Sequence, residues 1–262
     1  MRAVVLSAMS DIGIELVSSL KNKGYEVFGT YNSSKPCEKL IPKRNWFKLN
    51  IKNYNSESYK IWLKKVNQWD LFVSCIGTQE PIGLFKDINP EKWVEGVNYN
   101  SIYQIAAFLN ALPYANNKIV SDAIFFAGGG TNSATPFYSS QTLGKISLIK
   151  SVELLDYELE KVKVSILGPG WVKTKIHQGT LNAKHKAGQN YLKTIDMLNS
   201  PENLNPISKV VEDVHKIIKL PKDLVGGRNF SSVNDSISAD NLKRLKNKNT
   251  DFYRLRRAEN DN

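Results

Sequence analysis

Short apolar runs rich in β-branched residues alternate with segments of helical periodicity from the start of the chain. The apolar runs predict strands at residues 3–6, 25–30, 46–51, 70–74, 123–126, 162–167 and 224–230. Apolar residues at helical spacing predict helices at 12–20, 59–66, 90–112, 142–160 and 206–220. Repeated strand–helix alternation indicates an α/β fold, a single Rossmann-type doubly wound parallel sheet with helices on both faces.

The length of 262 residues suits one domain over 1–262, with no internal repeat or long linker. The core is expected at about 2–177. Residues 175–205 are polar and contain Gly179, Gly188 and Pro201. This stretch is too long for a simple connection, so it predicts a mobile lid or substrate loop. A basic tail follows at about 238–262.

The charge balance favours anionic partners, because 36 Lys and Arg face 25 Asp and Glu. Nucleic acid is the least favoured of these, since the basic C-terminal cluster comes with no zinc-finger, helix-turn-helix or RNA-binding motif. No apolar run approaches the length of a membrane helix. The two cysteines, Cys37 and Cys75, form no disulfide framework and no metal-ligand spacing. We therefore expect a cytoplasmic protein without a metal or a membrane segment.

The turn from the first strand into the first helix, Ser7 to Gly13, is where such a sheet would hold a pyrophosphate. Of the three glycines expected there, Gly13 is the one present. A second interpretation is a capped helix start, with Ser10 or Asp11 as the cap.

Landmarks further along the chain resemble the short-chain dehydrogenase/reductase family over about residues 2–177. They are the loop Leu6 to Gly13, Ser74-Cys75-Ile76-Gly77 after the fourth predicted strand, the asparagine in Val97-Asn98, and Pro169-Gly170 followed by Thr174. The stretch Gly128 to Asn132, with Ile176-His177, is similar to members that accompany surface-polysaccharide or sugar biosynthesis. The resemblance implies an anionic or sugar-like small molecule as partner. It also implies a homodimer or homotetramer formed through the two long helices.

The resemblance further implies a nicotinamide dinucleotide cofactor. Its expected binding residues are Ser7, Ser10, Asp11, Ile12, Gly13, Asn32, Asn50, Gly77, Lys145, Pro169, Gly170, Val172 and Thr174. No acid follows the second predicted strand to bind the ribose hydroxyls, whereas Lys35 and Arg44 could meet a 2′-phosphate. NADP is therefore favoured over NAD.

The family's hydride transfer implies a tyrosine that moves the proton, a lysine four residues later and a serine on the substrate oxygen. The lysine corresponds to Lys145, and Asn98 corresponds to the family's catalytic asparagine. Gln141 occupies the tyrosine position, and Gly128 or Ala127 the serine position. A carboxamide cannot serve as a general acid.

Three other residues are alternative proton donors: Tyr138, Lys145 itself, and His177, which is expected to be exposed. Two functions stay open at this point. One is a weakly catalytic or non-catalytic dinucleotide-binding protein. The other is an active NADP-dependent oxidoreductase or epimerase that acts on a sugar-like substrate with a substitute donor.

Overall fold

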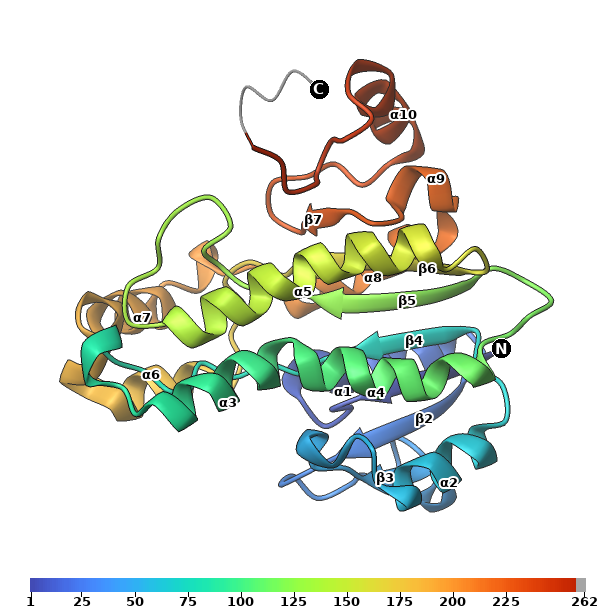
Figure 1. Ribbon diagram of the computed structural model, residues 1–262, viewed down its shortest axis with the longest axis horizontal. Coiled ribbons are helices and arrows are strands. Elements are labelled where there is room, and N and C mark those ends of the chain that lie inside the picture. Colours follow the sequence, from blue (N-terminus) through green and yellow to red (C-terminus); the bar gives the residue numbers. More distant parts are fainter. Residues whose placement is uncertain (258–262) are drawn as a thin grey trace.

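The computed structural model describes residues 1–257, and its seven strands form one parallel sheet (Figure 1). The strand order is β3-β2-β1-β4-β5-β6-β7, which confirms the predicted doubly wound fold. The strands are β1 (Arg2–Leu6), β2 (Glu26–Tyr31), β3 (Trp46–Lys48), β4 (Leu71–Ser74), β5 (Ser121–Phe126), β6 (Val162–Gly168) and β7 (Asn229–Ser231). Because every pairing is parallel, all carboxyl ends meet at one edge of the sheet.

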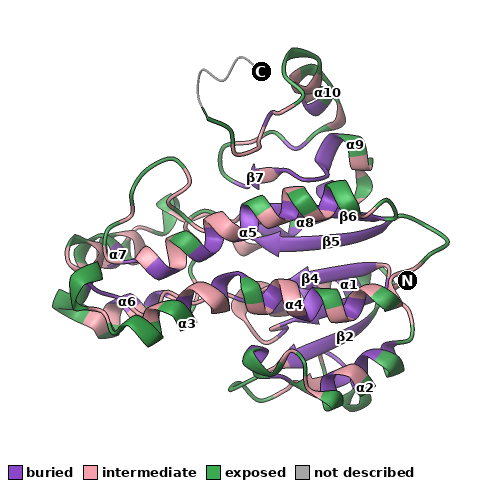
Figure 2. Ribbon diagram, viewed as in Figure 1, coloured by how far each residue is buried: buried purple, intermediate pink, exposed green. Residues whose placement is uncertain are grey.

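Helices cover both faces of the sheet. On one face lie α1 (Asp11–Asn22) and α8 (Ile207–Lys219), with the short α9 (Lys222–Val225) and α10 (Ala239–Lys248). On the other face lie α2 (Glu57–Val66), α4 (Ile102–Ala111) and α5 (Ser139–Glu158). Val4 and Leu6 contribute to one apolar core and Ala3 and Val5 to the other, as the two-residue period of a strand requires. Figure 2 shows the buried strands between these layers.

The helix predicted over 90–112 is two helices, α3 (Pro90–Asn100) and α4. The break falls at Ser101, which has φ −141° and ψ −80° and whose hydroxyl donates to the Val97 carbonyl. Polar side chains that bond to the local backbone compete with helical hydrogen bonds. The apolar periodicity continues across the break and therefore does not reveal it.

The segment 175–205, predicted as a mobile lid or substrate loop, is largely helical. This segment forms α6 (His177–Ala183) and α7 (Gln189–Asn199), joined by a 3-10 turn. Both helices lie beside the amino end of α5, at the left of Figure 1. They bury a few small or polar residues, notably Thr180, Ala187 and Thr194, so the apolar periodicity that marks a helix is absent.

The strand predicted over 224–230 is confined to β7. Leu224 and Val225 are buried as the last residues of α9, and Gly227 turns the chain with φ +67°. Within the predicted basic tail, α10 is followed by a segment that packs on β7, while residues 258–262 lie outside the described part of the chain. No helix within residues 1–257 is long and apolar enough to cross a bilayer.

Candidate functional site

A cleft of about 1200 Å³ runs along the edge of the sheet where the carboxyl ends of the strands meet. Successive strand ends contribute Tyr31, Ser7, Cys75, Ala127, Pro169 and Ser231 to its lining. Ligands of open α/β sheets bind at this edge, next to the point where the strand order reverses. The topology alone therefore brings together residues that are far apart in the sequence.

The loop between β1 and α1 is a tight turn that requires glycine at its last position. Ser7 has φ +56°, and the Ser10 hydroxyl caps α1 by accepting the Gly13 N–H at 3.1 Å. A Cβ on Gly13 would lie 2.6 Å from the Ser7 carbonyl oxygen. Gly13 thus lets the helix start against the loop, behind the cleft lining.

Asp11 begins α1 and projects a carboxylate into the cleft. Its Oδ2 accepts the backbone N–H of Lys175 at 2.6 Å, and its Oδ1 lies 3.8 Å from the Lys175 ammonium nitrogen. Lys175 belongs to the segment between β6 and α6. The two residues therefore connect opposite walls of the cleft.

Most of the other predicted cofactor residues line the same cleft. Those that line the cleft with Ser7, Ser10 and Asp11 are Ile12, Asn32, Gly77, Lys145, Pro169, Gly170, Val172 and Thr174. The first-turn N–H groups of Asp11 and Ile12 have no acceptor among the hydrogen bonds of the described residues. Such free donors at a helix N-terminus suit a phosphate, although the Asp11 carboxylate must turn aside for one.

Asn50, which is predicted to bind the cofactor, is not among the residues that line the cleft. Its side-chain oxygen accepts the Lys52 N–H at 3.2 Å and caps a 3-10 turn, and the residue is exposed outside the cleft lining. An asparagine side chain bonds readily to the backbone two residues ahead, and this bond holds the Asn50 amide in its own turn. Lys35 and Arg44 also lie outside the lining, whereas Asn32 and Ser33 belong to it.

Lys145 of α5 is 3% exposed at the centre of the cleft floor. Its ammonium donates to the carbonyl of Ile76, two residues after β4, at 3.2 Å and to that of Phe126, the last residue of β5, at 2.7 Å. Burial lowers the pKa of Lys145 to about 7, against a smaller opposing effect of Cys75. No carboxylate is bonded to this ammonium among the described residues.

Gly128 and Gln141 lie beside Lys145. A Cβ built on Gly128 would be 3.0 Å from Lys145 Cγ and 3.9 Å from Gln141 Nε2. Of the two candidates for the serine position, Gly128 is therefore the one next to both Lys145 and Gln141. All three line the cleft, and neither Gly128 nor Gln141 carries an ionisable proton.

The asparagine that packs against Gly77 and α5 is Asn100, two residues after the predicted Asn98. Neither residue lines the cleft; Asn98 is half-buried and Asn100 is fully buried. The Asn100 amide accepts the Thr78 N–H at 3.2 Å and donates to the carbonyls of Thr78 and Gly96. The helix breaks directly after Asn100, at Ser101. This is the signal that apolar periodicity misses.

Tyr138 lines the cleft, but its hydroxyl proton has a partner. Tyr138 Oη lies 2.5 Å from Thr180 Oγ1 of α6, and Thr180 donates its own proton to Gln79 Oε1 at 2.8 Å. Since a threonine hydroxyl has one proton, Tyr138 must be the donor to Thr180. Burial raises the pKa of Tyr138, and the bond to Thr180 opposes this.

His177 is 8% exposed, so the expectation of an exposed side chain is wrong. Its ring stacks on Trp171, with centroids 5.1 Å apart, and its Nε2 lies 2.8 Å from the Val172 carbonyl oxygen. The Lys193 ammonium lies 5.8 Å from the centroid of the Trp171 ring. This stack fixes the wall of the cleft that follows Gly170.

Comparisons with known proteins agree with this geometry. A family model described as enoyl-(acyl carrier protein) reductase matches residues 7–203. A search of curated protein sequences finds no match.

Solved structures similar to this chain share its fold at low sequence identity. A short-chain dehydrogenase/reductase of Saccharomyces cerevisiae is 21% identical, with a TM-score of 0.77 over 91% of this chain and 98% of its own. Ligand-free aldohexose dehydrogenase of Thermoplasma acidophilum is 14% identical, with a TM-score of 0.74 over 91% and 96%. A short-chain dehydrogenase of Shigella flexneri complexed with NADP is also 14% identical, with a TM-score of 0.73 over 88% and 96%.

Proposed function

The chain belongs to the short-chain dehydrogenase/reductase family, and from this premise we propose that its cleft binds NADP(H) but does not support the family's usual proton transfer. NAD is the alternative cofactor. The observation that carries the proposal is the replacement of both hydroxyl-bearing positions around Lys145 by Gly128 and Gln141.

Cofactor binding is supported by the residues at the head of α1 and on the cleft floor. The free N–H groups of Asp11 and Ile12 would hold the pyrophosphate, and Lys145 would donate to the ribose hydroxyls. Val172 and Thr174 would receive the nicotinamide amide. When bound, the cofactor supplies or accepts a hydride. The structure complexed with NADP among those of similar fold adds support for NADP.

Loss of the usual chemistry is supported by what surrounds the reacting position. A carbonyl reduction needs a proton at the substrate oxygen, and a positioned general acid contributes typically about 10²–10⁴-fold to such a rate. Gln141 offers only an amide N–H, and Gly128 offers no hydrogen bond from a side chain. The cleft then serves to bind a dinucleotide and a second small molecule, for regulation or for assembly with an active partner.

The second candidate is an active oxidoreductase or epimerase on a sugar-like substrate, in a surface-sugar pathway. It is supported by hydroxyl and amide side chains that line the same cleft as Gln141, namely Thr131, Asn132, Ser133, Thr135 and Asn190. Tyr138 would be its proton donor. Because that proton is directed at Thr180, the first candidate is preferred.

One experiment separates the two. NADPH is titrated by its fluorescence, and its oxidation is then followed by absorbance with a panel of keto- and aldohexoses. The proposal expects saturable binding without turnover, in the wild type and in Tyr138→Phe alike. Turnover that disappears in Tyr138→Phe would establish the second candidate, and absence of NADPH and NADH binding would reject both.

A homodimer or homotetramer is proposed on the apolar side chains left exposed on α4 and α5. They include Leu109, Leu143, Leu154 and Tyr157, which are 46–90% exposed. Such side chains on adjacent helices are typical of an interface. Light scattering of the wild type and of a Leu109→Lys/Leu154→Lys variant tests it.

A further inference from the structure

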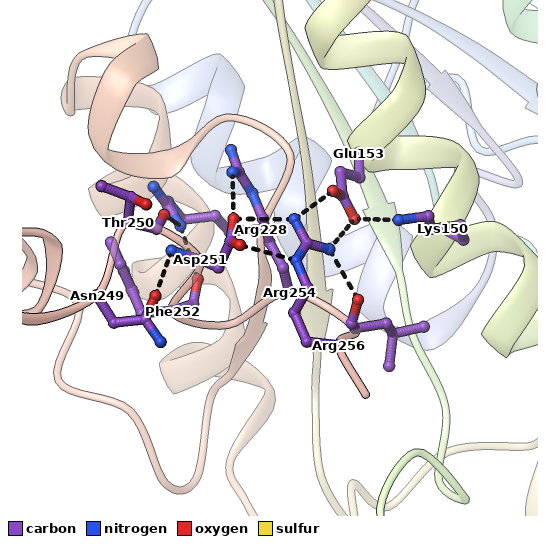
Figure 3. Close-up of polar contacts among 10 residues, drawn as sticks. Lys150, Glu153, Arg228, Asn249, Thr250, Asp251, Phe252, Arg254 and Arg256 are labelled. Atoms are coloured by element: carbon purple, nitrogen blue, oxygen red, sulfur yellow. Dashed lines mark hydrogen bonds and ion pairs between the residues drawn. The ribbon is translucent and has the colours of Figure 1, made fainter. Parts of the chain in front are cut away.

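The last described residues, 249–257, form a strap along the outer edge of β7. Asn229 of β7 donates its N–H to the Tyr253 carbonyl at 2.9 Å. Arg228 Nη1 donates to the carbonyls of Thr250 and Phe252, and its guanidinium lies 3.7 Å from the centre of the Phe252 ring. These contacts fix the strap on the sheet (Figure 3).

Cations outnumber carboxylates where the strap meets α5. Arg256 bonds to Glu153 and Asp251, and Figure 3 shows its guanidinium between these two carboxylates. Arg254 bonds to the same Asp251 at 3.1 Å, and Lys150 bonds to Glu153 at 2.9 Å. Three cations thus share two carboxylates, and Arg228, which lies nearby, bonds to neither of them. The nearby Asp156 and Asp223 are each paired with a lysine of their own.

Two of the arginines also have an Nε–H donor with no hydrogen-bond partner within residues 1–257. Arg228 is 3% exposed, and its Nε has no hydrogen-bond partner within residues 1–257. The buried Nε of Arg254 is unpaired in the same sense. Burial and the charge of Arg254 lower the pKa of Arg228 to about 10, so the two guanidiniums stand close enough to repel each other. Unpaired buried donors next to like charges are costly unless a ligand satisfies them.

This cluster opens onto the cleft. Arg254 and Arg256 line it at the β7 end, together with Asn229. The carboxylate at this end, Asp235, is held by the Ser231 N–H at 2.6 Å, and burial raises its pKa. An anion entering from the cleft can therefore reach Arg254 without displacing a carboxylate that is paired with another arginine.

We infer that the β7 end of the cleft is an anion subsite, in which Arg254 receives a phosphate group carried by the small molecule that occupies the cleft, while the buried Arg228, outside the cleft lining, adds its charge. The inference rests on the proposed function in one respect, namely that a second ligand binds beside the dinucleotide. Guanidiniums bind phosphate oxygens through paired N–H donors, and the excess charge and the free Nε groups favour such a ligand. The ligand class is then a phosphorylated, sugar-like compound.

The test uses the full chain labelled with ¹⁵N in its arginine Nε atoms. Inorganic phosphate is added at constant ionic strength, with chloride as the balancing ion, and the Nε–Hε resonances are followed. Arg254→Lys assigns the Arg254 signal, because lysine lacks this group while it keeps the charge. The expected result is a saturable shift of the Arg228 and Arg254 signals, with affinity reduced about tenfold or more in Arg254→Gln. Lys118→Gln, an exposed lysine remote from the cleft, is the matched control and should bind as the wild type does.

Two further measurements keep the result interpretable. Glucose 6-phosphate should shift the same signals and glucose should not. Shifts that are linear in phosphate, or that chloride reproduces, would overturn the subsite, because they report screening alone. NADPH binding is measured separately by fluorescence and should be unchanged in Arg254→Gln. Failure of NADPH binding with intact phosphate shifts would reject the proposed function and leave the subsite standing.

Discussion

Asp11 and Lys175 connect two walls of the cleft, although 164 residues separate them in the sequence. The carboxylate of Asp11 stands at the head of α1, where a pyrophosphate would bind, and the Lys175 N–H holds it there at 2.6 Å. A carboxylate favours the positive end of a helix, and so does a phosphate. The two compete for one position.

Asp11→Gly is expected to raise the affinity for NADPH about tenfold, which corresponds to about 1.4 kcal/mol. The substitution removes a negative charge next to the phosphates and opens access to the first-turn N–H groups of residues 11 and 12 in α1, which have no acceptor within residues 1–257. Lys175→Met is expected to lower the affinity, since it removes the ammonium near Asp11 Oδ1. Fluorescence titration of NADPH measures both. An unchanged affinity in Asp11→Gly would show that the phosphates lie elsewhere.

A double variant, Gly128→Ser with Gln141→Tyr, is expected to gain reductase activity about 10²–10⁴-fold over the wild type. Tyrosine four residues before Lys145 shares a helix face with it, and the ammonium favours the phenolate. The new serine Cβ requires a shift of a few tenths of an ångström in the flexible Lys145 side chain, 3.0 Å away.

Turnover of NADPH with a hexose panel measures this gain. Addition of Lys145→Met to the double variant is the control and should abolish the gain, while circular dichroism checks that all variants fold. A double variant that binds NADPH and the sugar yet shows no turnover would locate the missing chemistry outside these two positions.

The buried Lys145 should make stability depend on pH. Its pKa in the folded protein, about 7, is below the ordinary value of 10.5 in the unfolded chain. The unfolded state therefore binds more protons between these values. As a result, the free energy of unfolding of the wild type rises as the pH increases above 7, whereas below pH 7 this group causes no change with pH. Between pH 7 and pH 9 the gain is at most about 2–3 kcal/mol.

Lys145→Met removes this dependence. Urea unfolding of both proteins at pH 6, 7, 8 and 9 measures the difference, in which the contributions of other groups cancel. Lys118→Met controls for loss of an exposed lysine. Parallel curves for wild type and Lys145→Met would contradict a neutral amine in the folded cleft.

Sequence patterns predict the strands and the edge at which the site forms. The runs around Val4 and Phe72 are apolar and short, and a parallel sheet leaves no choice about where their carboxyl ends meet. The loop from Ser7 to Gly13 then falls at the cleft because it follows β1.

Other parts of the site depend on bonds that apolar patterns do not encode. Asn100, rather than Asn98, is the buried asparagine beside Gly77, because its side-chain amide bonds to Thr78 across 22 residues and the helix breaks after it. Asn50 bonds to its own turn. His177 is buried because its ring stacks on Trp171, which lies in the connection before α6. In each case a specific polar or aromatic contact decides the structure, and its partners are either distant in the sequence or close together within a turn.

At the amino ends of β5 and β6, away from the cleft, the buried pair Asp122–Lys163 gives the stability a second dependence on pH. The Lys163 ammonium lies 2.8 Å from Asp122 Oδ1 and also donates to the carbonyls of Ile217, Ile218 and Leu220. Burial raises the pKa of Asp122 from 3.8 to about 6, although Lys163 opposes this rise. The folded state therefore holds the proton more tightly than the unfolded state does.

Since protonation of Asp122 favours the folded state, this group's contribution to stability falls as pH rises from about 4 to 6 and is constant above that. Asp122→Asn cannot titrate, so its free energy of unfolding relative to the wild type should increase by on the order of 3 kcal/mol between pH 4 and pH 7. Asp87→Asn, at an exposed aspartate, should show no such increase. Urea unfolding across this range measures the difference. A difference that decreases with pH would mean that Lys163 outweighs burial and holds the pKa of Asp122 below its ordinary value.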